Sequence, residues 1–325
     1  MGVNISMQYR KFGKTDVALS IFGMGGHEYL ADGRSRGFNE NFNLAVTPNH
    51  IFEGFGQEVR KQALKIAFDS GVNFFDVTQD SEKEALGRNL KEISAPYEFY
   101  IQTRPEGMVY TYDEYNQKMA DSDLLRAEVQ RILKLLQRDR LDFLNIAFMK
   151  SALDNDPQYL EKIESNIADL KKEGLIRFAC ADTFSGEYTY LKQIAAGCFD
   201  AVYLNFNFAD HGAGLHVLPA AKKLGLGVIT REAFMKGQLF KMGVECGFTD
   251  RSRLAAIGIK WNLSHPAVTN VIVGTNNPDH LISNLKVIDN LELTDEDHRI
   301  IDLIKTSETY KAYEERKTKE FFASK

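Results

Sequence analysis

Cysteine is scarce in this sequence of 325 residues, and its three cysteines lie far apart. Cys180, Cys198 and Cys246 show no CxxC spacing, so neither a disulfide framework nor a structural zinc site is indicated. No run of about 18 apolar residues is present to cross a bilayer. The N-terminal MGVNISMQYRKFG also lacks the apolar core of a signal peptide. These absences predict a cytoplasmic protein that makes no membrane contact.

An excess of positive charge is also missing. The chain has 40 basic and 45 acidic residues, a net charge of -5, and both signs are scattered along its whole length. A protein that neutralises the phosphates of a nucleic acid needs a basic face. Nucleic acid is therefore not expected as a partner, and a small molecule is.

The apolar content is sufficient for a large core, because 44% of the residues are hydrophobic and 26% are charged. The length allows either two average domains or one α/β barrel with a few insertions. We find no linker rich in proline or glycine and no low-complexity tract. One domain over residues 1–325 is the simpler interpretation.

Short apolar runs rich in Val, Ile, Phe and Tyr alternate with longer segments of helical period, as in parallel βα units. The predicted strands are 18–24, 72–77, 98–103, 141–147, 176–181, 201–206, 227–231 and 270–275. Amphipathic helices are predicted at 57–71, 124–139 and 159–174. Eight such units predict an α/β fold, a single (β/α)8 TIM barrel.

Three segments extend the predicted barrel. QYRKFG and DVALS indicate a short N-terminal β-hairpin that plugs the N-terminal end of the barrel. The tail 295–325 indicates an extra C-terminal helix, frayed over EERKTKEFFASK. The long segment 25–55 follows the first barrel strand, so we expect a lid over the barrel mouth, although a solvated surface loop remains the alternative. That lid would carry His27, Glu28, Asp32, Arg34 and Arg36 near the site.

Barrel enzymes take their catalytic residues from the C-terminal ends of several strands. The polar residues at those ends here are His27, Glu28, Asp76, Arg104, Lys150, Asp182, Thr183, Tyr203, Asn205, Arg231, Glu232 and the GTNN run from Gly274. Gathering so many charges in a partly dry mouth is costly unless they pair or meet a polar ligand. The sequence therefore predicts a site for a polar or anionic small molecule.

The order and spacing of several motifs resemble the aldo-keto reductases over nearly the whole chain. The motifs are MQYRKFGKTDVALSIFGMGG, GVNFFDV followed by SEKEALGRNL, LDFLNIAFMK, EGLIRFACA, and VIVGT with Asn284 ten residues after Gly274. The resemblance implies a barrel without a Rossmann domain, with NADP(H) stretched across the mouth. It also implies a catalytic tetrad of Asp, Tyr, Lys and His, in which Tyr protonates the carbonyl oxygen.

One of the four tetrad positions matches. Asp76 fits the Asp, whereas Ser81 stands at the Tyr position, Arg104 at the Lys position and Lys150 at the His position. The contacts that the family makes to nicotinamide differ as well. Asp182 and Thr183 replace a Ser-Asn pair, Tyr203 replaces Gln, and Arg231 replaces a stacking Tyr, which would place a cation beside a ring that is positive when oxidised.

The adenosine end of the implied cofactor site agrees better with the family. Gly274, Thr275 and Asn284 align, Asn276 lies between them in the same turn, and His280 replaces the Arg that commonly pairs the 2'-phosphate. NADP is the cofactor this implies, with NAD or no dinucleotide as the alternatives.

The substituted residues have their own chemistry. Arg104 cannot release a proton at ordinary pH, so it would clamp a carboxylate or phosphate or stabilise an oxyanion. Lys150 would have a lowered pKa if it stood beside Arg104 and Arg231 in a dry mouth, and would stay charged if Asp76 or Asp182 paired with it. Both states remain open from the sequence.

Three functions follow. The first is NAD(P)H-linked oxidoreduction of a small polar or anionic carbonyl, with the proton supplied by Lys150 or Tyr203. The second is a lyase, dehydratase or isomerase acting on a hydroxy or sugar acid through Lys150, Asp76 and an arginine clamp. A variant of it places a divalent metal on some of His27, Glu28, Asp76, Asp182 and Glu232, although no spacing requires one. The third is a non-catalytic binding subunit.

Overall fold

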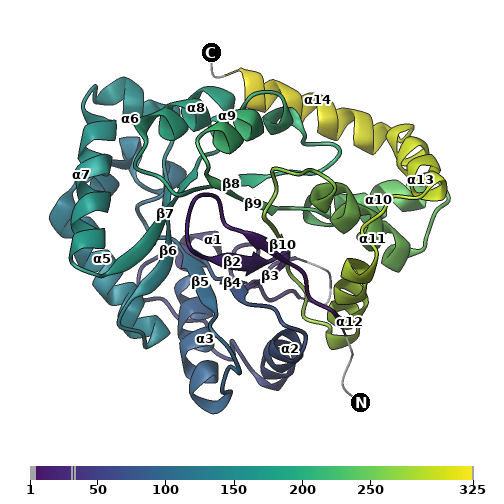
Figure 1. The fold of residues 1–325 in the computed structure, drawn as a ribbon, viewed down its shortest axis with the longest axis horizontal. Coiled ribbons are helices and arrows are strands. Elements are labelled where there is room, and N and C mark those ends of the chain that lie inside the picture. The colour runs from purple at the N-terminus through teal and green to yellow at the C-terminus, as the bar shows by residue number, and fades with distance from the viewer. Residues whose placement is uncertain (1–4, 31, 33, 324–325) are drawn as a thin grey trace.

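Eight parallel strands close into a barrel in the computed structural model, which describes residues 5–30, 32 and 34–323 (Figure 1). Its strands are β3 (Phe22–Gly25), β4 (Phe74–Asp76), β5 (Tyr100–Thr103), β6 (Leu141–Ala147), β7 (Ile176–Asp182), β8 (Ala201–Asn205), β9 (Gly227–Arg231) and β10 (Asn270–Val273). They follow one another around the ring in chain order, and β10 closes it by pairing with β3. The predicted (β/α)8 fold is confirmed.

The predicted strand 18–24 was wrong in its bounds, because it spans two elements. Ala18–Ser20 forms β2, which pairs antiparallel with β1 (Tyr9–Lys11) in the N-terminal hairpin, and the barrel strand β3 begins at Phe22. Phe12, between the hairpin strands, packs edge-to-face on Phe143 inside the barrel, with ring centroids 4.9 Å apart. A side chain at Gly227 would collide with the Phe12 ring. The predicted hairpin therefore does plug this end of the barrel.

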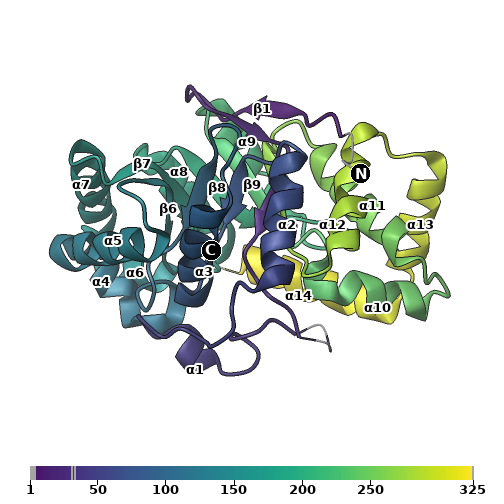
Figure 2. The same ribbon diagram turned by 90° about the horizontal axis from the view of Figure 1, so that it is seen from below.

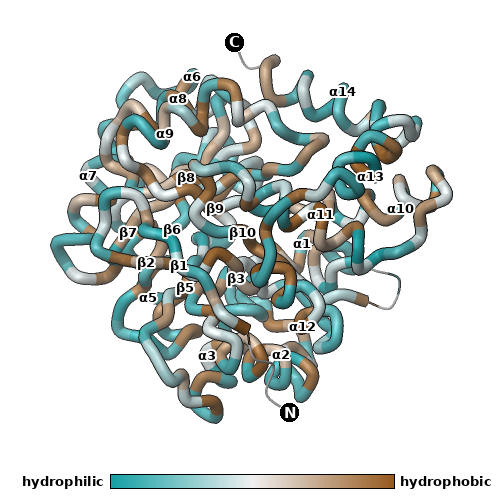
Figure 3. The backbone as a smooth tube through the Cα atoms, turned by 45° about the vertical axis from the view of Figure 1, so that its right-hand side comes forward, coloured by the Kyte–Doolittle hydropathy of each residue, from teal (hydrophilic) through white to brown (hydrophobic). Residues whose placement is uncertain are grey.

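Helices surround the strands (Figure 1). They are α1 (Phe42–Ala45), α2 (Glu58–Asp69), α3 (Asp80–Glu92), α4 (Gln117–Ala120), α5 (Ser122–Leu136), α6 (Lys150–Asn155), α7 (Tyr159–Lys172), α8 (Gly186–Ala196), α9 (Val217–Lys223), α10 (Gln238–Glu245), α11 (Arg251–Leu263) and α12 (Pro278–Lys286). Hydrophilic and hydrophobic residues alternate along the helices of this outer ring (Figure 3). That alternation lets each helix bury one stripe against the strands.

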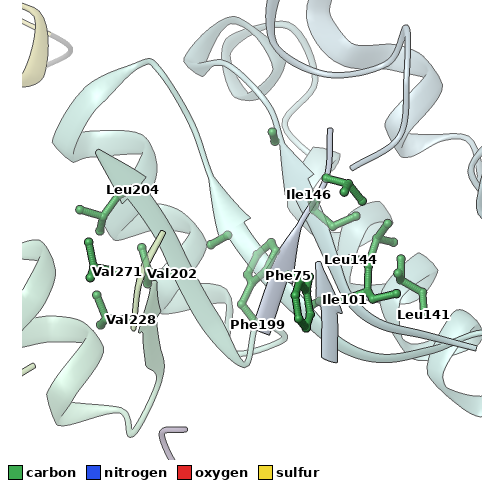
Figure 4. Close-up of a cluster of buried hydrophobic side chains, with 14 of the residues drawn as sticks. Phe75, Ile101, Leu141, Leu144, Ile146, Phe199, Val202, Leu204, Val228 and Val271 are labelled. Atoms are coloured by element: carbon green, nitrogen blue, oxygen red, sulfur yellow. The ribbon is translucent and has the colours of Figure 1, made fainter. Parts of the chain in front are cut away.

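Two hydrophobic layers follow from the alternating direction of side chains along each strand. Outward residues such as Phe75, Ile101, Leu144 and Val202 form a large cluster between the strands and the helices (Figure 4). The inward residues form a separate cluster that the hairpin completes: Phe12, Val17, Leu19, Phe74, Tyr100, Phe143, Phe178, Cys180, Ala201, Tyr203, Ile229 and Ile272. The barrel interior is thus filled on the hairpin side, which leaves the opposite end for a site.

The C-terminal tail forms two helices, α13 (Asp295–Lys305) and α14 (Glu308–Phe322). The expected fraying was wrong, since α14 runs to Phe322 and Phe321 stacks 6.4 Å from the buried Tyr190. The two final residues lie outside the described residues. Within the described ranges, no helix is both long enough and apolar enough to span a bilayer.

Candidate functional site

Polar side chains form a layer inside the barrel at the C-terminal ends of its strands. They are Asp76, Gln102, Asn145, Asp182, Tyr203, Asn205 and Arg231. On β4, β5 and β6 these residues share the inward direction of an aromatic residue two positions earlier, and on β7 Asp182 shares that of Cys180. Most of this layer is buried. Asp76, Asp182, Tyr203, Asn205 and Arg231 are among the strand-end residues that the sequence indicated, whereas Gln102 and Asn145 are not.

Asp76 is buried and accepts two hydrogen bonds across the barrel. The Tyr203 hydroxyl donates at 2.8 Å and the Gln102 amide at 3.1 Å. Burial raises the pKa of Asp76 above its ordinary value, against the effect of the Tyr203 hydrogen bond. Burial and the Asp76 carboxylate together raise the pKa of Tyr203 well above its ordinary value. The Tyr203 proton is therefore held firmly at neutral pH.

Asp182 and Arg231 form an ion pair beside this contact. Two guanidinium nitrogens donate to the two carboxylate oxygens at 3.0 and 3.1 Å, and Nε donates to Asn205 at 2.6 Å. Asp182 is fully buried and also accepts hydrogen bonds from Tyr110, Asn145 and Tyr190. All three nitrogens of Arg231 are thus engaged, so the expected role of this arginine as a free anion clamp is not supported.

Arg104 is the contrasting arginine. Its side chain is 7% exposed, yet it forms no hydrogen bond or ion pair with any residue that the structure describes, and its Nε is buried without a partner. Its guanidinium instead lies 5.3 to 5.6 Å from the rings of Phe38, Tyr110 and Tyr112. Burial acts to lower its pKa, but Glu106 and these tyrosines outweigh burial and raise it. A charged donor enclosed by aromatic rings is suited to an anion.

A second group of buried charges includes Glu106, two residues after Arg104. Lys83 on α3 is fully buried, with its ammonium 2.9 Å from Asp80 and 3.7 Å from Glu106. Neither carboxylate oxygen of Glu106 has a hydrogen-bond partner among the described residues. Burial raises the pKa of Glu106 to about 7, against the effect of Lys83 and Arg104. Glu106 thus faces Lys83 as well as Arg104 and is not a dedicated counter-charge for the arginine.

His27 stands at the edge of the mouth in a pair with Glu82. His27 Nδ1 lies 2.7 Å from Oε1 of Glu82, a buried carboxylate that also accepts from Thr78 and Gln79. Burial acts to lower the pKa of His27, but Glu82 outweighs it, so the pKa is raised. Its side chain is 36% exposed and its ring packs on Phe38, 5.3 Å between centroids. Phe38 thus borders both His27 and Arg104.

The Glu82 carboxylate makes stability depend on acid pH. Burial acts to raise its pKa, but His27 and the other donors outweigh it and lower the pKa from 4.5 to about 2. The stabilisation is therefore complete above about pH 4.5 and is lost as the pH falls through 2. We expect about 2 kcal/mol less unfolding free energy at about pH 3 than at pH 6 from this group. Urea unfolding at both values should show this difference in the wild type and not in Glu82→Gln, with Glu92→Gln on the surface of α3 as the control.

Lys150 does not join the polar layer. It is the first residue of α6, and its ammonium binds both carboxylate oxygens of Asp154 at 2.7 Å. Pairing with Asp76 or Asp182, one of the two alternatives that the sequence left open, is not observed, because the partner of Lys150 lies one turn along the same helix. Ser81 also lies elsewhere, buried in α3 and accepting a hydrogen bond from the Phe52 amide.

The described residues of segment 26–57 (26–30, 32 and 34–57) lie at the barrel end opposite the hairpin, where α1 is seen in Figure 2. Phe38 and Phe42 bring this segment into the mouth, with Phe42 packing on Tyr112 at 5.4 Å. Of the charged residues expected near the site, Glu28 instead binds the Gly56 amide and Arg36, which holds the segment together. Asp32 and Arg34 pair with each other on the exposed side. Aromatic side chains therefore cover the mouth.

The segment after β9 has a strained backbone. Glu232, Met235 and Lys236 have φ angles of 63°, 55° and 54°, a region that residues other than glycine rarely adopt. The Lys236 ammonium is 72% exposed and lies 3.2 Å from Glu232. Strain of this kind concentrates at ligand sites.

The neighbouring turn between β10 and α12 contains the expected cofactor residues. Asn277 caps α12 and Thr275 accepts a hydrogen bond from its amide, while His280 is exposed and Asn284 is buried. The Asn276 amide donates to the carbonyl of Tyr29, and its own oxygen is buried without a partner. A side chain at Gly274 would come within 2.8 Å of the Tyr29 hydroxyl. This turn and segment 26–57 are thus in contact.

No three His, Cys, Asp or Glu side chains come close enough to hold a metal ion in the part of the chain that the structure describes. The metal variant of the second function, on His27, Glu28, Asp76, Asp182 and Glu232, therefore has no structural support.

Several site residues are absent from the sequence-based set. They are Phe38, Glu82, Lys83, Gln102, Glu106, Tyr110, Tyr112 and Asn145. Glu82 and Lys83 belong to the SEKEALG segment, which is rich in charged residues. In the structure, helix α3 buries more polar than apolar residues. The aromatic residues give no comparable signal, because each comes from a long segment of irregular structure.

Comparison with known proteins places the fold. The model of the Aldo/keto reductase family matches residues 49–246 and 246–306. The holo form of the aldo-keto reductase AKR11C1 from Bacillus halodurans superposes with a TM-score of 0.68 at 16% identity, covering 92% of this chain and 96% of that chain. Two structures assigned to the same family, from Pseudomonas aeruginosa, give 0.59 at 21% and 0.60 at 24% identity, each covering 86% of this chain and 93% of the other. At these identities the structural likeness shows the barrel fold.

Proposed function

This chain belongs to the aldo-keto reductase family, and we propose that it catalyses the NAD(P)H-linked interconversion of a small anionic carbonyl compound and its alcohol. The observation that carries the substrate class is Arg104, a cation 7% exposed that lacks any carboxylate in contact among the described residues. Burying an unpaired charge costs several kcal/mol. A carboxylate on the substrate would supply the missing counter-charge.

The residues after β9 and β10 fit the phosphate end of a dinucleotide. Lys236 offers an exposed side chain, and the strained backbone around it follows β9. Because β9 pairs with β10, this segment and the Gly274–Asn276 turn leave neighbouring strands. The N-terminal end of α12 adds a positive partial charge at the same edge. His280 and Asn284 extend this region along the helix.

Asp182 removes the repulsion that a lone Arg231 would exert on an oxidised, positively charged nicotinamide ring. The two side chains neutralise each other, so a positive ring would meet a balanced pair instead of a lone cation. When bound, the reduced nicotinamide would supply hydride to the carbonyl carbon. Asp76 and Tyr203 would line the floor, and the aromatic rings of Phe38 and Tyr112 would limit the access of water.

The alternatives receive less support from the geometry. A lyase or isomerase using Lys150 and Asp76 requires both groups at one substrate, whereas Lys150 is bound to Asp154 outside the polar layer. A non-catalytic binding subunit could also use the buried Arg104, unpaired among the described residues, to hold an anion. Turnover distinguishes it from an enzyme.

Cofactor binding is the first test. We expect NADPH at about a hundred times its Kd to stabilise the protein by about 2.7 kcal/mol, visible as a rise in Tm of several degrees. NADP+, NADH and NAD+ in parallel establish the preference. Loss of NADPH absorbance should then follow addition of pyruvate or glyoxylate, and much less of uncharged acetaldehyde. Flat melting curves with all four dinucleotides would refute the proposal.

A further inference from the structure

The His27–Glu82 pair lies at the rim of the mouth, and the family's tyrosine is absent from its usual place. We propose that His27 gives the proton to the substrate oxygen, from its Nε2 atom. This inference rests on the proposed function. Glu82 fixes Nδ1 at 2.7 Å, which leaves Nε2 with no partner among the residues that the structure describes.

The other polar groups of the mouth are engaged or unsuitable as proton donors. The Tyr203 hydroxyl donates to Asp76 and is 2% exposed. The Tyr110 hydroxyl donates to Asp182, and the Lys150 ammonium is bound to Asp154. Arg104 keeps its proton at any ordinary pH. His27, with 36% of its side chain exposed, combines an available N–H with access to the mouth.

The position of Phe38 connects His27 to the substrate site. The Phe38 ring lies 5.3 Å from the His27 ring and 5.6 Å from the Arg104 guanidinium. A small molecule whose carboxylate binds Arg104 beside this ring would have its carbonyl end on the side of His27. An imidazolium there could also hydrogen-bond the carbonyl oxygen before it gives up the proton.

The step needs only the substrate and a hydride, which the reduced nicotinamide of the proposed function would supply. As hydride adds its electron pair to the carbonyl carbon, the carbonyl oxygen takes the proton, so the Nε2–H bond breaks and an O–H bond forms. The imidazole becomes neutral and regains a proton from water through its exposed edge. In the direction of alcohol oxidation the same atom accepts the proton.

Three charged groups act on His27, a fourth acts on its partner Glu82, and together they set the response of the pair to pH. Glu82 from α3 and Asp76 from β4 favour the protonated imidazole, and Arg104 after β5 disfavours it. Arg60 from α2 interacts electrostatically with Glu82. Because the pKa of His27 is raised, reduction should persist to a higher pH than an ordinary imidazole would allow, and should decline as the imidazolium loses its proton. Without Glu82 the decline should move to lower pH.

The experiment compares His27→Gln with His216→Gln. His216 pairs with Glu187 through the same Nδ1 contact, also at 2.7 Å, but lies before α9 and not among the mouth residues. With NADPH and pyruvate, kcat for His27→Gln should fall at least about a hundredfold, with the NADPH-induced rise in Tm retained. His216→Gln should keep the wild-type kcat.

A readout on the free protein makes the test independent of turnover. NMR titration of the imidazole signals should give a pKa above the ordinary value for His27, which falls in Glu82→Gln. An unchanged kcat and pH profile in His27→Gln, in a wild type that binds NADPH and turns over pyruvate, would overturn this inference alone. A wild type that neither binds NADPH nor turns over would overturn the proposed function and this inference with it.

Discussion

Replacing Arg104 by Met is expected to lower kcat/KM for pyruvate or glyoxylate by at least about a hundredfold. The reason is that a carboxylate bound beside a buried guanidinium loses its counter-charge, and truncating one member of such a pair typically costs 2 to 5 kcal/mol. The unfolding free energy should fall by no more than about 2 kcal/mol, because the side chain loses its contacts with three aromatic rings but no ion-pair partner among the described residues. Steady-state kinetics and urea unfolding measure the two effects.

The control for this substitution is another arginine that packs on an aromatic ring. Arg138 lies 5.0 Å from the Phe99 ring and pairs with Asp142, away from the mouth. Arg138→Met should leave kcat/KM unchanged. If Arg104→Met lowers activity equally for acetaldehyde and pyruvate, the arginine does not recognise the carboxylate and the proposed substrate class is wrong.

Replacing Asp182 by Asn is expected to lower the unfolding free energy by about 3 to 5 kcal/mol. The substitution leaves Arg231 enclosed without a counter-charge, and breaking a buried ion pair on one side has this cost. It also disturbs the hydrogen bonds that Tyr110, Asn145 and Tyr190 donate to the carboxylate. Denaturant unfolding at neutral pH measures the loss.

Two comparisons isolate the effect of the pair. Asp154→Asn removes the partner of Lys150, a largely exposed i,i+4 pair, and should cost less than about 1 kcal/mol. The double variant Asp182→Asn with Arg231→Met should lose less than the sum of the single variants, because no uncompensated charge remains. Strict additivity would show that the ion pair is not the source of the stability.

The ring of strands was predictable because strands and helices leave different spacings of apolar residues in the sequence. The spacing has a period of two in strands and of 3.6 in helices. The strands at 141–147 and 227–231 have the predicted bounds. The prediction of one strand where the structure has β2 and β3 has a clear physical cause. Ala18–Met24 is one apolar run, and the change of partner at Ile21 from the hairpin to the barrel leaves no mark in composition.

The site was predictable at the strand ends and not beyond them. Asp76, Asp182 and Arg231 meet because ring closure requires it. Lys150 was misplaced because the strand ends three residues earlier and a helix begins, and its partner Asp154 sits at the i,i+4 spacing that favours a pair on one helix. Among the described residues Arg231 is paired and Arg104 is not, because pairing depends on side chains from strands far apart in the sequence. Residue spacing alone could therefore not show which arginine is free to bind an anion.

Closure of the barrel by pairing β10 with β3 has a consequence for synthesis in the cell. Asn270 also donates its side-chain amide to the carbonyl of Ser20, so this seam joins two ends of the chain roughly 250 residues apart. At about 5–20 residues per second, the ribosome needs roughly 12 to 50 seconds between making the two strands. Throughout that interval β3 has an unsatisfied edge, which makes the nascent chain a candidate for chaperone binding until its last barrel strand emerges.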